Sequence, residues 1–181
     1  GKRLHEYAKT PGYDFSWNDP WQLTVDYERT LEEISHGVID YEVDTIIDTQ
    51  EYFTFLKLSG ERLTEERVIE LLNEPEWKTL KEEGSSFDYK AFVEHFGFDK
   101  MRDEGKIHEV WLWTFPYGGM WESNMMGKDA FWLNSDPTPG INCTNHLCVM
   151  GLNYERDLAC AIESYGHRFE STMMEVYGWW N

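Results

Sequence analysis

Residues 107–115 read Ile-His-Glu-Val-Trp-Leu-Trp-Thr-Phe, and this stretch decides the fold. Its short length and its aromatic and branched side chains predict a β-strand. A second strand is predicted over His146–Leu152, a nearly all-apolar run that is typical of a strand covered on both faces. A long helix is predicted over Glu155–Tyr177. This order predicts two adjacent parallel strands joined by a long crossover, with the helix packed on their sheet.

The residues before this stretch predict mainly helices with recognisable ends. The first helix is expected to begin at Pro20, after a cap by Asn18 or Asp19, and to end at Gly37. A short strand is predicted over Val38–Ile47, which is rich in β-branched residues. Further helical stretches are expected within 60–96 and 98–104, with a cap at Thr64, an interruption at Pro75, a start at Asp88 and a stop at Gly97.

The fold class that this order favours is α/β, with a layered, mostly parallel sheet and flanking helices. A length of 181 residues predicts a single domain over 1–181. The number of strands is low for a complete sheet of this kind, so the missing strands either carry no recognisable pattern in this sequence or lie upstream of Gly1. We expect the chain to be a module of a longer secreted protein. The segment beginning at Gly1 has no apolar signal core, so either a signal has been removed or the chain begins inside that longer protein.

Charge and composition narrow the class of partner. The chain has 34 acidic against 16 basic residues, a formal net charge of −18, which argues against nucleic acid. No run of about 18 apolar residues occurs, so no membrane span is expected. The three cysteines leave two readings open, one Cys143–Cys148 bridge or three free thiols. The triplet Asn142-Cys143-Thr144 fits the acceptor pattern for glycosylation.

The long segment 116–145 carries the residues best suited to chemistry. Glu122 follows Trp121 there, and burial beside the indole would raise the pKa of Glu122, as a general acid requires. Glu155, at the end of the second strand, is the expected second carboxylate, and paired carboxylates among tryptophans indicate a glycoside hydrolase. We therefore expect a hydrolase of glycan or another cell-wall polymer, with Glu122 and either His167 or Glu155 as acid and base.

The final helix has two distinct faces at a spacing of about 100° per residue. Its expected core face consists of Leu158, Ile162, Tyr165, Phe169, Met173 and Val176. The opposite face consists of Arg156, Cys160, Glu163, His167, Glu170 and Met174. That face is either a solvated surface with paired charges or one wall of a cleft. In the second case Glu122 and Asn124 are expected to meet Asn153, Glu155 or Arg156, with His167 and Glu170 lining the same cleft.

Three other interpretations compete with the hydrolase. The chain can be a non-catalytic extracellular module that binds carbohydrate through surface aromatics, namely Trp17, Trp21, Trp121 and Trp132. Trp111, Trp113, Trp121 and Trp132 can instead be core residues. A metal held by His167 and Glu170 would need Glu122 or His146 as a further ligand. Without a nucleotide-binding or metal motif, we expect neither a cofactor nor a metal.

Several motifs together resemble a family of largely uncharacterised secreted bacterial proteins. The motifs are Glu109-Val110-Trp111-Leu112-Trp113, Glu122-Ser123-Asn124-Met125, Asn134-Ser135, Met150-Gly151-Leu152-Asn153-Tyr154-Glu155-Arg156 and Tyr165-Gly166-His167-Arg168-Phe169-Glu170-Ser171. The resemblance spans about residues 20–175 and implies an extracellular setting, often beside other modules. It carries no established reaction. The motif positions that it marks as site residues are Glu122, Asn134, Asn153, Glu155, Arg156, His167, Arg168 and Glu170; with Trp121 and Asn124 they are our expected catalytic and substrate-binding set.

Overall fold

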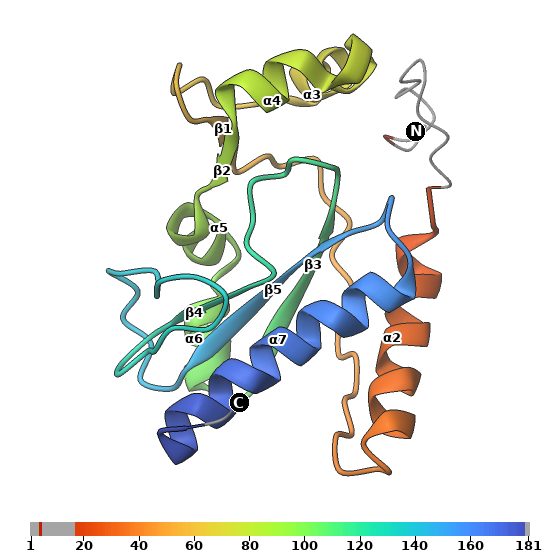
Figure 1. The fold of residues 1–181 in the computed structure, drawn as a ribbon. Helices are drawn as coiled ribbons and strands as arrows, with labels where there is room; N and C mark the ends of the chain where they lie inside the picture. The colour runs from red at the N-terminus through yellow and green to blue at the C-terminus, as the bar shows by residue number, and fades with distance from the viewer. Residues whose placement is uncertain (1–3, 5–16, 180–181) are drawn as a thin grey trace.

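A computed structural model describes residue 4 and residues 17–179 of the chain (Figure 1). In the described part, the helices are α2 (Pro20–Ile34), α3 (Glu65–Asn73), the 3₁₀ helix η1 (Pro75–Trp77), α4 (Lys78–Glu83), α5 (Tyr89–Phe96), α6 (Phe98–Asp103) and α7 (Leu158–Tyr177). The strands are β1 (Thr54–Leu56), β2 (Ser85–Phe87), β3 (Glu109–Thr114), β4 (Ser123–Met126) and β5 (Leu147–Asn153). No described helix is both long enough and apolar enough to cross a membrane.

The central sheet has the order β3-β5-β4. Strands β3 and β5 run parallel, from the pair Glu109 and Cys148 to the pair Thr114 and Asn153, so their predicted adjacency is confirmed. Strand β4 pairs antiparallel with β5, and β1 pairs antiparallel with β2 in a separate small sheet. The chain is therefore α/β with mixed sheets, and a mostly parallel sheet is not confirmed for the residues that the structure describes.

Helices cover both faces of the central sheet (Figure 1). On one face, α7 and α2 pack over an apolar cluster that contains Tyr27, Leu133, Met150 and Leu152. On the other face, α5 and α6 enclose a second cluster, which includes Phe92, Phe98, Val149 and Leu147. Along β3, Trp111 and Trp113 join the first cluster, whereas Val110 and Leu112 join the second. This alternation is the period of two expected for a strand covered on both faces.

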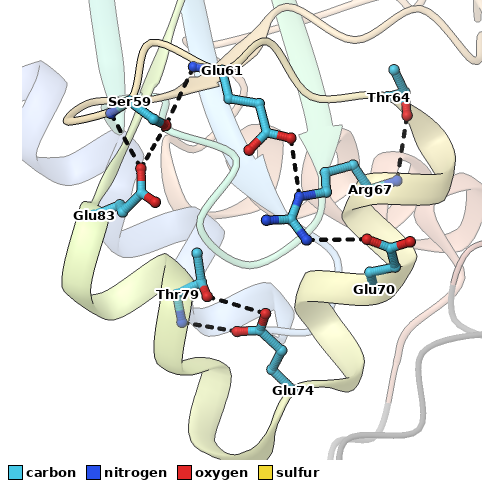
Figure 2. Close-up of polar contacts among 8 residues, drawn as sticks. All are labelled: Ser59, Glu61, Thr64, Arg67, Glu70, Glu74, Thr79 and Glu83. Atoms are coloured by element: carbon cyan, nitrogen blue, oxygen red, sulfur yellow. Dashed lines mark hydrogen bonds and ion pairs between the residues drawn. The ribbon is translucent and has the colours of Figure 1, made fainter.

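Helix α3, helix α4 and the turn after β1 form a third layer, which Figure 2 shows in close-up. The predicted cap is confirmed, because the Thr64 hydroxyl accepts a hydrogen bond from the Arg67 amide at 3.3 Å. The Arg67 guanidinium bridges Glu61 and Glu70, at 3.0 Å from each. Two more contacts join Ser59 to Glu83 and Glu74 to Thr79. These contacts surround a cluster of buried leucines that packs against Phe115, the residue after β3.

Several predicted helix ends are also confirmed. Asp19 caps α2, with Pro20 in the first turn, and Asp88 caps α5. Gly97 ends α5 at a φ of +70°, a left-handed conformation that favours glycine. Each of these signals is local, which is why the sequence alone reveals it.

The predicted strand over Val38–Ile47 is wrong. This segment carries no regular secondary structure, with Ile39 and Tyr41 packed against the core while Ile46 and Ile47 are exposed. Its β-branched residues favour an extended backbone. A strand also needs a neighbour that accepts its backbone hydrogen bonds, and no described strand pairs with it.

The predicted core face of α7 is partly wrong. Leu158, Ile162 and Tyr165 pack against the core as expected, but Phe169 and Val176 are exposed. The residues of α7 that are fully buried are small, namely Ala161, Ser164 and Ser171. Small side chains let the helix lie close to its neighbours, and the Ser171 hydroxyl donates a hydrogen bond to the Leu133 carbonyl at 2.7 Å.

Candidate functional site

Glu122 lies directly before β4, where residues 120–122 cross over strand β5. Its carbonyl accepts a hydrogen bond from the Gly151 amide at 3.1 Å. A side chain at position 151 would place its Cβ 2.3 Å from the Trp121 carbonyl oxygen and 2.7 Å from the Met120 Cβ. Only glycine therefore lets the chain cross at this point, and the crossing fixes where Trp121 and Glu122 lie.

A hydrogen bond joins Glu122 to the second half of the long segment. The Asn134 side-chain amide donates to the Glu122 carboxylate at 3.1 Å. Among the described residues, the other oxygen of that carboxylate and the side-chain carbonyl of Asn134 have no hydrogen-bond partner. Both atoms remain able to accept hydrogen bonds from a ligand.

Two exposed tryptophans adjoin this pair along the chain, since Trp121 precedes Glu122 and Trp132 lies two residues before Asn134. Trp121 is 55% exposed and Trp132 is 54% exposed, so for these two the interpretation as core residues is wrong. Leu133 and Ser135 are buried while Trp132 is exposed and Asn134 half-buried, an in-and-out alternation that directs Trp132 and Asn134 outward. We call Trp121, Glu122, Trp132 and Asn134 the tryptophan platform.

Asn124 holds the platform together but is not free to bind substrate. Its side chain is buried, and its amide group donates to the Ser135 hydroxyl and to the Asp136 carbonyl, each at 2.9 Å. Its carbonyl accepts from the Thr138 hydroxyl at 2.7 Å. Both amide hydrogens are therefore used within the protein, and the residue anchors segment 133–138 to β4.

Asn153, Glu155 and Arg156 lie together at the carboxyl end of β5. The Tyr154 amide donates to the Thr114 carbonyl at 3.1 Å, so the end of β3 lies beside them. Glu155 is half-buried, and one of its carboxylate oxygens is buried without a hydrogen-bond partner. Burial raises the pKa of Glu155 to about 7, although its own backbone amide and the Arg156 guanidinium act in the opposite direction.

The turn around Glu155 is held from outside by Asn18, a residue expected only as a helix cap. The Asn18 backbone amide donates to the Tyr154 carbonyl at 2.8 Å, and its side-chain amide donates to the Arg156 carbonyl at 3.0 Å. The Trp17 ring contacts the Tyr154 ring, with 5.0 Å between their centroids. Residues 17–18 therefore clamp both sides of Glu155.

His167 and Glu170 lie on the solvent-facing side of α7. The His167 Nδ1 is 3.4 Å from a Glu170 oxygen, and the His167 Nε2 is 4.0 Å from a Glu163 oxygen. All three side chains are exposed, as the interpretation of a solvated face with paired charges expects. In the part of the chain that the structure describes, no three metal-binding side chains are placed to hold an ion together.

Arg168, an expected substrate-binding residue, turns inward instead. Its guanidinium Nη1 lies 2.6 Å from a Glu109 oxygen, and the two side chains are 18% and 7% exposed. The Tyr41 hydroxyl donates to Glu109 at 3.0 Å and contacts the Tyr165 hydroxyl at 3.1 Å. Burial, followed by the charge of Glu109, raises the pKa of Tyr41, so its hydroxyl stays protonated as a donor. Glu109, the partner of Arg168, is not among the predicted site residues. The one sign of it in the sequence is a carboxylate within an otherwise apolar predicted strand.

The expected site residues thus fall into separate groups. Among the described residues, no side-chain hydrogen bond or ion pair joins Glu122 or Asn124 to Asn153, Glu155 or Arg156, and none joins Glu122 to His167. The reason is that strand β4 forms inside the long segment, and residues 133–138 beside it satisfy the polar side chains. Comparison with models of protein families, with curated proteins and with solved structures finds no match.

Proposed function

We propose that this protein binds carbohydrate through the tryptophan platform. The observation that carries the proposal is that two half-exposed tryptophans, Trp121 and Trp132, adjoin the hydrogen-bonded pair Glu122 and Asn134 along the chain. Indole rings stack on the apolar faces of sugar rings, while free carboxylate and amide oxygens accept hydrogen bonds from sugar hydroxyls. The tryptophan platform brings both kinds of group together within residues 121–134.

The contacts of Glu122 favour binding over hydrolysis at this position. Acid–base hydrolysis at Glu122 would need a second titratable group that reaches the same scissile bond, which in glycoside hydrolases means carboxyl groups roughly 5–9.5 Å apart. The hydrogen-bond partner of the Glu122 carboxylate within the described residues is the amide of Asn134, which does not titrate. Glu122 is thus suited to recognise hydroxyls, and the expected hydrolytic role of Glu122 with His167 has no supporting contact.

An extracellular polysaccharide or cell-wall polymer is the ligand class that we propose, with the chain acting beside other modules of the same polypeptide. The support is the resemblance of the motifs around Glu122 and Asn134 to secreted bacterial proteins. The net charge of −18 supports a partner other than nucleic acid.

Titration calorimetry of the protein with soluble glycan and wall-polymer oligosaccharides tests the proposal. Trp121→Ala and Trp132→Ala are expected to weaken binding about tenfold or more each, the usual cost of truncating an aromatic hot spot. Trp179→Ala is the matched control, because Trp179 is also exposed but lies after α7. Binding that survives both platform substitutions would refute the proposal.

A hydrolase remains as a second candidate, now centred on Glu155. One observation favours it: a carboxyl group with a buried, unpartnered oxygen and a pKa raised to about 7, at the carboxyl end of a parallel strand pair. Ligands of α/β proteins bind beyond this end of the strands, and a general acid requires such a pKa. Incubation with wall polymers and mass spectrometry of the products tests this candidate, and Glu155→Gln should abolish any cleavage.

A further inference from the structure

We infer that the tryptophan platform selects polymers of amino sugars that carry free, protonated amines. This inference rests on the proposed function and names the ligand class of the same site. It follows from the charge of Glu122, which is next to the exposed Trp121 in the chain, and from the hydrogen-bonding capacity that the fold leaves unused there.

The charge that Glu122 gives the platform is negative, and no cationic side chain among the described residues pairs with it. Glu122 has a carboxylate oxygen without a hydrogen-bond partner among the described residues, while its other oxygen accepts from a neutral amide. Within residues 121–140 the acidic side chains are Glu122, Asp129 and Asp136, against the single basic side chain of Lys128. The ammonium of Lys128 lies 3.9 Å from the carboxylate of Asp129, and both side chains point into solvent. Lys128 is therefore paired with Asp129 and leaves the charge of Glu122 in place.

A protonated sugar amine matches this arrangement better than a hydroxyl or an acetamide does. The ammonium group donates hydrogen bonds and carries a positive charge, and charge-assisted hydrogen bonds are shorter and stronger than neutral ones. Acetylation of the same amine removes the charge but keeps the sugar ring that stacks on indole. Uronic acids add a negative charge that meets Glu122 and a chain of net charge −18, so they are disfavoured.

Oligosaccharides with one backbone and different amine substitution test the inference directly. Calorimetric titrations at about pH 5.5, where amines are protonated, compare glucosamine oligomers, their N-acetylated forms and oligogalacturonate. The glucosamine oligomer is expected to bind about fivefold more tightly than its acetylated form, the usual scale of one exposed ion pair. This advantage should shrink with added salt, and oligogalacturonate should bind most weakly.

Substitutions separate the inference from the proposed function. Glu122→Gln keeps the shape and should abolish the preference for free amines while leaving the acetylated oligomer bound. Glu163→Gln on the outer face of α7 removes the same charge elsewhere and should change nothing, which controls for general attraction to an acidic protein. Equal affinity for both oligomers would overturn the inference and leave the proposed function intact. Binding of glucosamine oligomers that persists in Trp121→Ala and Trp132→Ala would overturn both.

Discussion

Glu109 and Arg168 form an ion pair of 2.6 Å between β3 and α7, on the face of the sheet that α2 also covers. Both side chains are largely withdrawn from water, and Tyr41 reaches the same carboxylate from the irregular segment that follows α2. One carboxylate therefore ties together three segments that are far apart in the sequence. A buried pair of this kind is costly to break because the remaining charge loses its partner.

Removal of either partner of this pair should destabilise the fold strongly. Arg168→Met and Glu109→Gln are each expected to lower the free energy of unfolding by about 3–5 kcal/mol, the usual cost of leaving one buried charge alone. The double variant should lose less than the two single losses combined. Urea unfolding in a double-mutant cycle measures this coupling, and strictly additive losses would show that the two side chains do not stabilise each other.

Glu155 should make stability fall as the pH rises. Its pKa is about 7 in the fold against an ordinary value of 4.5, so between these values the folded chain holds a proton that the unfolded chain has released. The contribution of Glu155 to stability is therefore fully present below pH 4.5 and is lost as the pH rises to about 7. Above that pH it changes no further. Glu155→Gln should flatten this dependence and raise the thermal midpoint by a few degrees at alkaline pH. Melting curves across the range check the sign.

Asp103 should make stability rise with pH, which is the opposite of the effect of Glu155. Its carboxylate accepts hydrogen bonds from the amides of Thr144 and Asn145 and from the Thr144 hydroxyl, and these hold the pKa of Asp103 well below its ordinary value. Its contribution to stability is therefore present above the unfolded pKa of about 4 and is lost as the pH falls. Asp103→Asn should lower the thermal midpoint by several degrees at neutral pH and have little effect in strong acid. Asp136→Asn, an exposed control, should melt like the parent protein.

Two glycines offer a matched test of the crossing over β5. Gly151→Ala places a methyl group against the Trp121 carbonyl and should cost about 1–3 kcal/mol of stability. It should also weaken carbohydrate binding, because Trp121 and Glu122 must move. Gly166→Ala meets nothing within 4 Å on α7 and should instead stabilise the helix by up to about 1 kcal/mol, with binding unchanged. Circular dichroism melts and calorimetry of both variants distinguish these outcomes.

The sequence predicts those elements whose signals are local. The caps at Asp19, Thr64 and Asp88 and the apolar runs of β3 and β5 lie where they were expected. Strand β4 reads Ser-Asn-Met-Met, which has no strand signal of its own, and it exists because β5 supplies its backbone partners. Residues 38–47 show the converse case. Their β-branched side chains predict a strand, but none forms because no described strand pairs with them.

The candidate site was predictable as a set of residues but not as one arrangement. Glu122 and Asn134 were both expected, yet their contact depends on β4 and on the glycine at 151. Arg168 is expected to bind substrate because it belongs to the motif at residues 165–171, whereas the inward turn of its side chain follows from Glu109 on a different element. Long-range partners of this kind leave no periodic trace in the sequence.

The three side-chain hydrogen bonds of Asn124 bear on how a ligand would be received. They join strand β4 to the segment that carries Trp132, so both halves of the platform are held in place before any sugar arrives. A preassembled surface spares the ligand the entropy of ordering two loops, which for flexible chain is about 1–2 kcal/mol per residue. We therefore expect the ligand to bind a surface that does not rearrange, so that selectivity depends on the fit of each sugar and not on loop closure.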